Sequence, residues 1–139
     1  MPRKKYFAPR DINHMIPQLE KVFEHIAMCK GRAEALAAQP TPAAKEPSLQ
    51  AMVQHQLLHS QVDFLMQAVQ DDIHHIMMLG GTTKDVDAGL VDFPGQMHGE
   101  DVWLCWKRGE TKVRYWHAID EGFSERQALP WSEIPGTSH

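Results

Sequence analysis

"MIPQLEKVFEHIAMCKGRAEAL", residues 15–36, decides the fold because its apolar residues follow an unbroken helical repeat. Ile16 and Phe23 widen this repeat into the stripe of a helix that packs on more than one neighbour. We therefore predict a helix over about residues 9–38, with a kink or a later start near Pro17, which lacks a backbone donor. The repeat has the alternating spacing of four and three that marks an a/d seam, and its members are Met15, Leu19, Val22, Ile26, Cys29, Ala33 and Leu36.

A second long helix follows a proline-rich break. The segment "QPTPAAKEP", residues 39–47, carries three prolines and must interrupt the first helix. Helical spacing resumes at about residue 48 and continues to residue 79, where Gly80 favours a helix end. The chain therefore begins with an antiparallel helical hairpin over residues 9–79. The clearest seam of the second helix is formed by Leu58, Val62, Leu65, Val69 and Ile76.

Beyond the hairpin the pattern changes to short β-branched and aromatic segments. "AGLVDFP" (88–94), "DVWLCWK" (101–107) and "KVRYWHA" (112–118) are typical of strands separated by turns. We predict one α+β domain over residues 1–139, in which a long antiparallel helical hairpin precedes a small three-stranded antiparallel β-meander. The meander occupies residues 84–126, and residues 127–139 form an irregular tail.

The last two predicted strands meet at a glycine. A two-residue loop at Gly109 and Glu110 would pair Val102 with His117. His117 would then share the more apolar face of the sheet with Trp106. A slip of one residue in this register would exchange the two faces.

Composition excludes several classes of protein. The 139 residues have a net charge of −4 and are 42% hydrophobic, which describes an ordinary globular chain. The only basic cluster is residues 3–5, so we expect no nucleic-acid partner. Apolar runs are too short for a membrane span or a signal peptide, so we expect no membrane partner. Two cysteines far apart favour a reducing, cytoplasmic location.

His117 is the most informative single side chain, and the sequence leaves two interpretations open. It could be a half-buried residue that fixes a strand end, or a general base or metal ligand. We predict that it is at least partly buried and hydrogen-bonded to Asp85 or Asp92, because an unpaired buried donor costs about 1–3 kcal/mol. His55 and His59 share a helix face and form a second, weaker metal candidate.

Three segments carry a resemblance to a known family. "KDVDAGLVDFPG" (84–95), "GEDVWLCWKRGE" (99–110) and "YWHAIDEGFSER" (115–126) are similar to the bacterial domain-of-unknown-function family 2203. The resemblance implies membership but no activity. It selects six polar candidates, which could form either a linked salt-bridge network or a polar pocket for a small anionic or metal-bearing ligand. The six are Lys84, Asp85, Asp92, Glu110, His117 and Arg126.

The two classes of function place the activity in different parts of the chain. We expect a non-enzymatic interaction module, a homodimer that associates through its hairpin like a coiled coil, because two helices cannot hide such wide apolar stripes. The alternative is a metal-dependent, hydrolase-like enzyme or a small-ligand-binding protein centred on His117. No catalytic residue or cofactor is identified, although a divalent metal is possible, and its candidate ligands are His117, Asp85, Asp92, His55 and His59.

Overall fold

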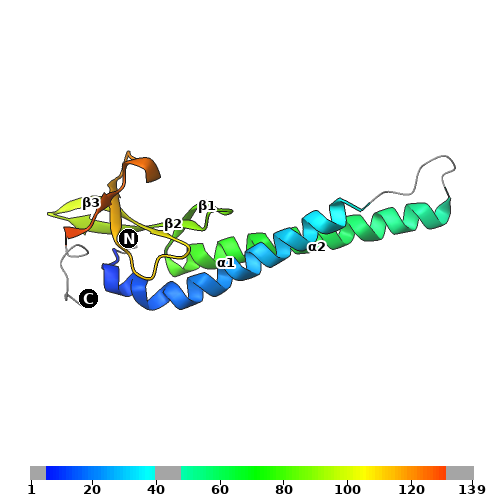
Figure 1. The fold of residues 1–139 in the computed structure, drawn as a ribbon, viewed down its shortest axis with the longest axis horizontal. Coiled ribbons are helices and arrows are strands. Elements are labelled where there is room, and N and C mark those ends of the chain that lie inside the picture. Colours follow the sequence, from blue (N-terminus) through cyan, green and yellow to red (C-terminus); the bar gives the residue numbers. More distant parts are fainter. Residues whose placement is uncertain (1–5, 40–47, 131–139) are drawn as a thin grey trace, which may run out of the picture. The chain divides into compact units, whose positions relative to one another are not determined.

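The computed structural model of the chain describes residues 6–39 and 48–130. Two helices precede an antiparallel sheet, which confirms the predicted α+β class (Figure 1). One compact unit spans Met1–Phe23 with His75–His139, and the other spans Glu24–His74. In chain order the elements are α1 (Pro9–Ala37), α2 (Leu49–Leu79), β1 (Thr82–Asp85), β2 (Leu90–Met97), β3 (Glu100–Lys107), β4 (Tyr115–Ala118), the 3₁₀ turn η1 (Phe123–Glu125) and β5 (Gln127–Ala128).

Local signals fix the start of α1. Pro9 occupies the first helical position, and the Asp11 side chain accepts a hydrogen bond of 2.8 Å from the backbone N–H of Ala8. This contact is half of a capping box, and proline at this position loses no intrahelical bond. The helix continues through Pro17, so the expected later start at this residue is wrong. Most of the predicted proline-rich connection, residues 40–47, lies outside the described residues.

Both ends of α2 are capped by the chain itself. Ser48 Oγ accepts a hydrogen bond of 3.1 Å from the backbone N–H of Ala51, as an N-cap serine does. At the other end Gly80 has a φ of 106°, and the N–H of Gly81 donates to the carbonyl of Ile76. This is a Schellman ending, which favours glycine at the left-handed position.

In the unit Glu24–His74 the two predicted seams bury their apolar side chains to different extents. Ile26, Cys29 and Ala33 of α1 and Val69 of α2 are buried. The earlier members of the α2 seam, residues 58, 62 and 65, are only half-buried. This half of the hairpin therefore has a continuous apolar seam but little further core.

The other unit holds the sheet, whose strand order is β1-β2-β3-β4-β5 with every neighbouring pair antiparallel. One face of the sheet packs on the N-terminal half of α1 and on Phe7, just before that helix. The Phe7 and Phe93 rings meet edge to face with centroids 5.3 Å apart, and the Phe23 and Trp106 rings lie 6.0 Å apart. The core of the unit lies along this contact.

The sheet has five strands rather than the three predicted. β1 is short, and most of its residues are polar and exposed. β5 contains only Gln127 and Ala128, both exposed, inside the segment predicted to be irregular. Neither strand has the alternation of apolar and polar residues that identifies a half-buried strand. Residues 131–139 of the predicted tail lie outside the described part of the chain.

The predicted pairing of the last strands is wrong by one residue. Trp103, not Val102, lies opposite His117. The tight two-residue turn lies instead between β2 and β3, at His98 and Gly99, whose φ values are both positive. The β3–β4 connection is longer, and His117 consequently lies on the opposite face of the sheet from the one predicted.

Glu110 explains why the tight turn at Gly109, closed by a hydrogen bond of 2.9 Å from the Glu110 N–H to the Lys107 carbonyl, does not lead directly into β4. Its carboxylate accepts a hydrogen bond of 2.7 Å from the backbone N–H of Lys107, and its carbonyl accepts one of 2.9 Å from Trp106 Nε1. These contacts fold Glu110 back on the end of β3 and prevent it from starting the next strand. No helix in residues 6–39 and 48–130 is both long and apolar enough to cross a membrane.

Candidate functional site

Three adjacent strands bring an aspartate, a cysteine and a histidine together. Asp92 on β2 lies opposite Cys105 on β3, and Cys105 lies opposite Tyr115 on β4, two residues before His117. Because side chains alternate along a strand, all of these residues point to the face of the sheet away from α1. Each member of the trio Asp92, Cys105 and His117 is at most 2% exposed. Their potential ligand atoms lie within 4.8 Å of one another.

The histidine is held by two acceptors. His117 Nε2 lies 2.9 Å from Asp92 Oδ2, and His117 Nδ1 lies 3.0 Å from the carbonyl oxygen of Ala118. A carbonyl can only accept, so Nδ1 carries a proton and donates it. A second proton must lie between Nε2 and the carboxylate for that contact to be a hydrogen bond. The predicted hydrogen bond between His117 and a carboxylate is therefore present, with Asp92 as the partner.

One oxygen of the trio has no strong hydrogen-bond partner. Among the described residues, Asp92 Oδ1 is one of two buried side-chain atoms without a hydrogen bond. Burial of a polar group normally requires a donor, and exceptions in native structures call for an explanation. The Cys105 thiol interacts with the Asp92 carboxylate as a weak donor, so this buried oxygen has at most a weak partner on a sheet face where water has almost no access.

Cys105 is a protonated thiol in this environment. Burial, and then the nearby Asp92 carboxylate, raise the pKa of the Cys105 thiol to about 12, although the Arg126 guanidinium acts in the opposite direction. A nucleophilic cysteine needs surroundings that lower its pKa. In the chain as described, Cys105 is therefore not an activated nucleophile.

An ion pair lies beside the trio. Arg126 Nη1 is 3.2 Å from Glu110 Oε2, and both side chains are about one-fifth exposed. The guanidinium also lies 3.9 Å from the centroid of the Tyr115 ring and 4.1 Å from that of Phe123. These contacts hold Arg126 over the part of the sheet that contains Cys105.

The other two motif residues lie apart from this cluster. Lys84 is on β1, where its ammonium group is 5.6 Å from the centroid of the Trp103 ring. Asp85 accepts a hydrogen bond of 2.9 Å from the backbone N–H of Ala88 and so fixes the turn before β2. The six candidates thus form two pairs and two separate residues, rather than one linked salt-bridge network.

The weaker histidine candidates lie on an exposed surface. His55 and His59 are both on α2, with ring centroids 6.5 Å apart. His59 Nδ1 is 3.2 Å from Asp63, and both of those side chains are more than two-thirds exposed. Their contact is an ordinary solvated pair one helical turn apart.

A second cysteine–histidine–aspartate set lies in the unit Glu24–His74. Cys29 Sγ is 3.6 Å from His25 Nε2, and His25 Nδ1 is hydrogen-bonded to Asp72. Here the histidine stands between the other two side chains, so the three form a line rather than converging on one point. The His25 side chain is almost half exposed.

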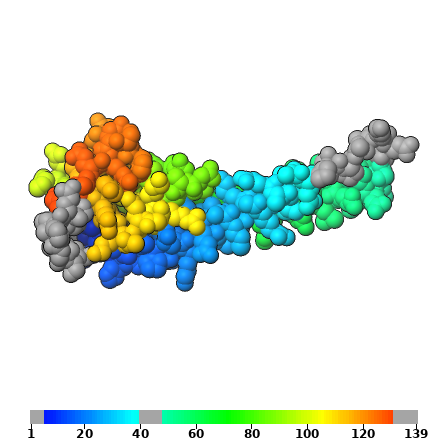
Figure 2. Space-filling model, in the orientation of Figure 1, coloured from blue at the N-terminus to red at the C-terminus, as the bar shows by residue number. Residues whose placement is uncertain are grey.

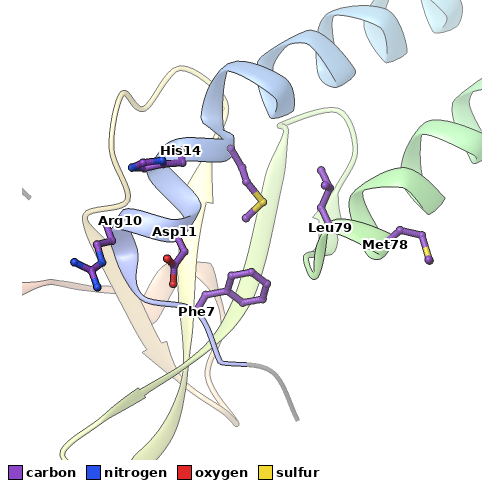
Figure 3. A pocket seen from close by; sticks show the side chains of 7 residues that line it. Phe7, Arg10, Asp11, His14, Met78 and Leu79 are labelled. Atoms are coloured by element: carbon purple, nitrogen blue, oxygen red, sulfur yellow. The ribbon is translucent and has the colours of Figure 1, made fainter. Parts of the chain in front are cut away.

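The sheet unit also contains an open pocket of about 760 Å³. Figure 3 shows that Arg10, Asp11 and His14 line it from the first turns of α1, while Met78 and Leu79 line it from the end of α2. None of the six motif residues lines this pocket. The pocket is therefore separate from the buried trio.

Sequence reasoning offered Asp85 or Asp92 as the partner of His117 and did not include Cys105 among the candidate residues. The missing signal was cross-strand pairing, because Asp92 and Cys105 face each other only in the observed register. In comparisons with known proteins, the family described as "Uncharacterized conserved protein (DUF2203)" matches residues 5–129. Neither a curated protein nor a solved structure matches the chain.

Proposed function

The chain belongs to this family of uncharacterized conserved proteins, and from its structure we propose that it is an interaction module that self-associates through α2. The observation that carries the proposal is an exposed apolar stripe on that helix. Leu49 and Phe64 are 78% and 76% exposed, and Val53 and Leu57 between them are also exposed. Their spacing of four, four and seven residues keeps all four side chains on one face of the helix.

The same stretch of α2 is unusually free of charge. Residues 49–62 contain no Asp, Glu, Lys or Arg. An exposed helix normally carries charged residues on its solvent face. Depletion of charge together with exposed Met and aromatic residues characterises the core of protein interfaces. The N-terminal half of α2 (teal in Figure 2) is thus a helix surface with the composition of an interface.

A second copy of this chain is the partner that fits the stripe best. A membrane-surface helix would carry Lys or Arg on its polar face, and α2 contains neither. For two copies, an antiparallel contact with its two-fold axis between Gln56 and Leu57 would place Leu49 of one copy against Phe64 of its partner. Such a self-complementary contact closes a dimer, and the two hairpins together would form a coiled-coil-like four-helix arrangement.

The proposed setting is the cytoplasm of a bacterium. Both cysteines are buried and free of disulfides. Free thiols of this kind are maintained in a reducing compartment. The proposal therefore describes a cytoplasmic homodimer whose hairpin provides the contact surface.

Analytical ultracentrifugation at micromolar concentrations tests the proposal. The unaltered protein should sediment as a dimer, and Phe64→Asp should sediment as a monomer with unchanged helical circular dichroism. Met28→Asp is the matched control, because Met28 is an exposed apolar residue on α1, outside the proposed contact. A monomeric unaltered protein, or a Phe64→Asp variant that remains dimeric, would refute the proposal.

A cross-linking variant tests the antiparallel geometry separately. Residues 49 and 64 are about 22 Å apart along one helix at 1.5 Å per residue, too far for a disulfide within a chain. Leu49→Cys combined with Phe64→Cys should therefore form covalent dimers on mild oxidation if the helices pair as proposed. Leu49→Cys alone and Phe64→Cys alone should each form far fewer covalent dimers. Equal cross-linking in all three variants would exclude this register.

A further inference from the structure

We propose that Asp92, Cys105 and His117 form a binding site for a divalent transition-metal ion of the zinc class. The trio offers one sulfur, one imidazole nitrogen and one carboxylate oxygen. This mixed donor set suits Zn²⁺ and Co²⁺, whereas Mg²⁺ and Ca²⁺ prefer sites made of oxygen alone. The inference is independent of self-association, because none of the three residues lies on α2.

The geometry needs only small side-chain movements. An ion with metal–ligand bonds of about 2.0–2.3 Å holds tetrahedral ligand atoms roughly 3.3–3.8 Å apart. The potential ligand atoms of the trio already lie within 4.8 Å of one another, and His117 Nε2 is 2.9 Å from Asp92 Oδ2. Side-chain rotations can therefore bring all three to one ion while the hydrogen-bonded strands stay in place.

The surroundings orient the histidine for this role. A metal-binding imidazole commonly donates its other N–H to a backbone carbonyl, which fixes the ring and leaves one nitrogen for the metal. His117 Nδ1 donates in this way to Ala118, and Nε2 is the nitrogen that faces Asp92. The ring is thus already held in a position suited to coordination.

Asp92 supplies the second, independent observation. Its Oδ1 is buried and has no hydrogen-bond partner among the described residues. The side chain as a whole is 2% exposed. The Cys105 thiol interacts with the Asp92 carboxylate only as a weak hydrogen-bond donor, and a cation bound between the two side chains would replace this weak donor with a full positive charge.

Charge balance is consistent with a buried ion. Binding of the ion would release the Cys105 thiol proton and the proton between His117 Nε2 and Asp92 to solvent. The resulting thiolate and the carboxylate together neutralise a divalent cation, and buried charges are tolerated when they are compensated. The nearby positive charge of Arg126 is paired with Glu110. The three protein ligands would leave one position of a tetrahedral ion for a water molecule. Because the ligands come from β2, β3 and β4, the ion would also tie these strands together.

Cobalt spectroscopy on the chelator-treated 139-residue chain tests the site. Titration with Co²⁺ should produce a thiolate-to-cobalt charge-transfer band that saturates at one equivalent. Cys105→Ser should abolish the band, and Asp92→Asn and His117→Gln should each weaken binding at least tenfold. Cys29→Ser is the matched control, because Cys29 belongs to the other cysteine–histidine–aspartate set, and it should keep the band.

Two results would overturn the inference. One is the absence of a saturable band in the unaltered protein. The other is a band that persists in Cys105→Ser and disappears in Cys29→Ser. Circular dichroism checks that each variant folds, and if Cys105→Ser does not, X-ray absorption of the zinc-loaded unaltered protein decides the question. Its first shell must contain one sulfur together with nitrogen or oxygen, and a shell without sulfur would refute the site. Phe64→Asp should bind Co²⁺ normally, which separates this site from the proposed dimer contact.

Discussion

Removal of the imidazole of His117 should destabilise the protein because it leaves the buried Asp92 carboxylate without its hydrogen-bond partner. In His117→Ala the Asp92 side chain keeps its burial but loses its hydrogen bond of 2.9 Å at Oδ2, and the Cys105 thiol is too weak a donor to compensate. A buried unpaired group costs about 1–3 kcal/mol. Breaking a buried charged pair costs about 3–5 kcal/mol. We expect His117→Ala to lower the free energy of unfolding by about 3 kcal/mol, where the two ranges meet.

The double-mutant cycle measures the contact itself. Asp92→Ala should also cost about 3 kcal/mol, because it leaves the imidazole without its acceptor. The double variant removes both polar groups, so it should cost about 4 kcal/mol rather than the sum of the two, and the coupling energy should be about 2 kcal/mol. Urea unfolding followed by circular dichroism provides the four values. All four proteins are measured with chelator present and at the same concentration, so that metal binding and self-association do not contribute to the differences in stability.

An exposed pair of the same residue types provides the control. His59 and Asp63 are 3.2 Å apart, but their side chains are 70% and 68% exposed. The double-mutant cycle of His59 and Asp63 should give a coupling energy of at most about 0.5 kcal/mol, because solvent screens their contact. The reasoning fails if the coupling between Asp92 and His117 is no larger than that of the exposed pair.

Other positions give independent predictions. Gly80→Ala should lower the free energy of unfolding, measured with urea, by about 3 kcal/mol, because φ is +106° and an added Cβ would overlap the Phe7 ring. Gly109→Ala should lower it by only about 1 kcal/mol, because φ is +98° but the space around the glycine is open. Phe23→Ala removes a ring that is 1% exposed and should cost about 3–5 kcal/mol, measured in the same way; a loss below 1 kcal/mol would contradict the assigned core. For the Cys105 thiol, the pKa is raised from 9.0 to about 12 in the folded chain, so above pH 9.0 the unfolded state releases a proton that the folded state keeps. Stability should therefore fall with rising pH between 9.0 and about 12 more steeply than in Cys105→Ala, and parallel pH profiles would contradict the raised pKa.

The sequence by itself determined the helices. The seam from Met15 to Leu36 and the prolines that follow it predict a helix ending at residue 38, and α1 ends at Ala37. Ser48 and Gly80 mark the two ends of α2 because capping depends on residues a few positions apart. A hydrogen bond between His117 and a carboxylate was also predictable, since a histidine in an apolar strand needs a polar partner, but the choice of Asp92 over Asp85 came from the structure.

Only the tertiary structure decided which side chains share a face of the sheet. A two-residue loop at Gly109 and the longer connection that Glu110 creates are both compatible with the local pattern, yet they place His117 on opposite faces. The recruitment of Cys105 beside Asp92 depends on the register between β2 and β3, and its position beside His117 depends on the register between β3 and β4. Strand pairing is set by contacts between residues distant in sequence, and a slip of one residue reverses every side chain. Helical periodicity needs no such partner, which is why the hairpin could be predicted and the composition of the buried trio could not.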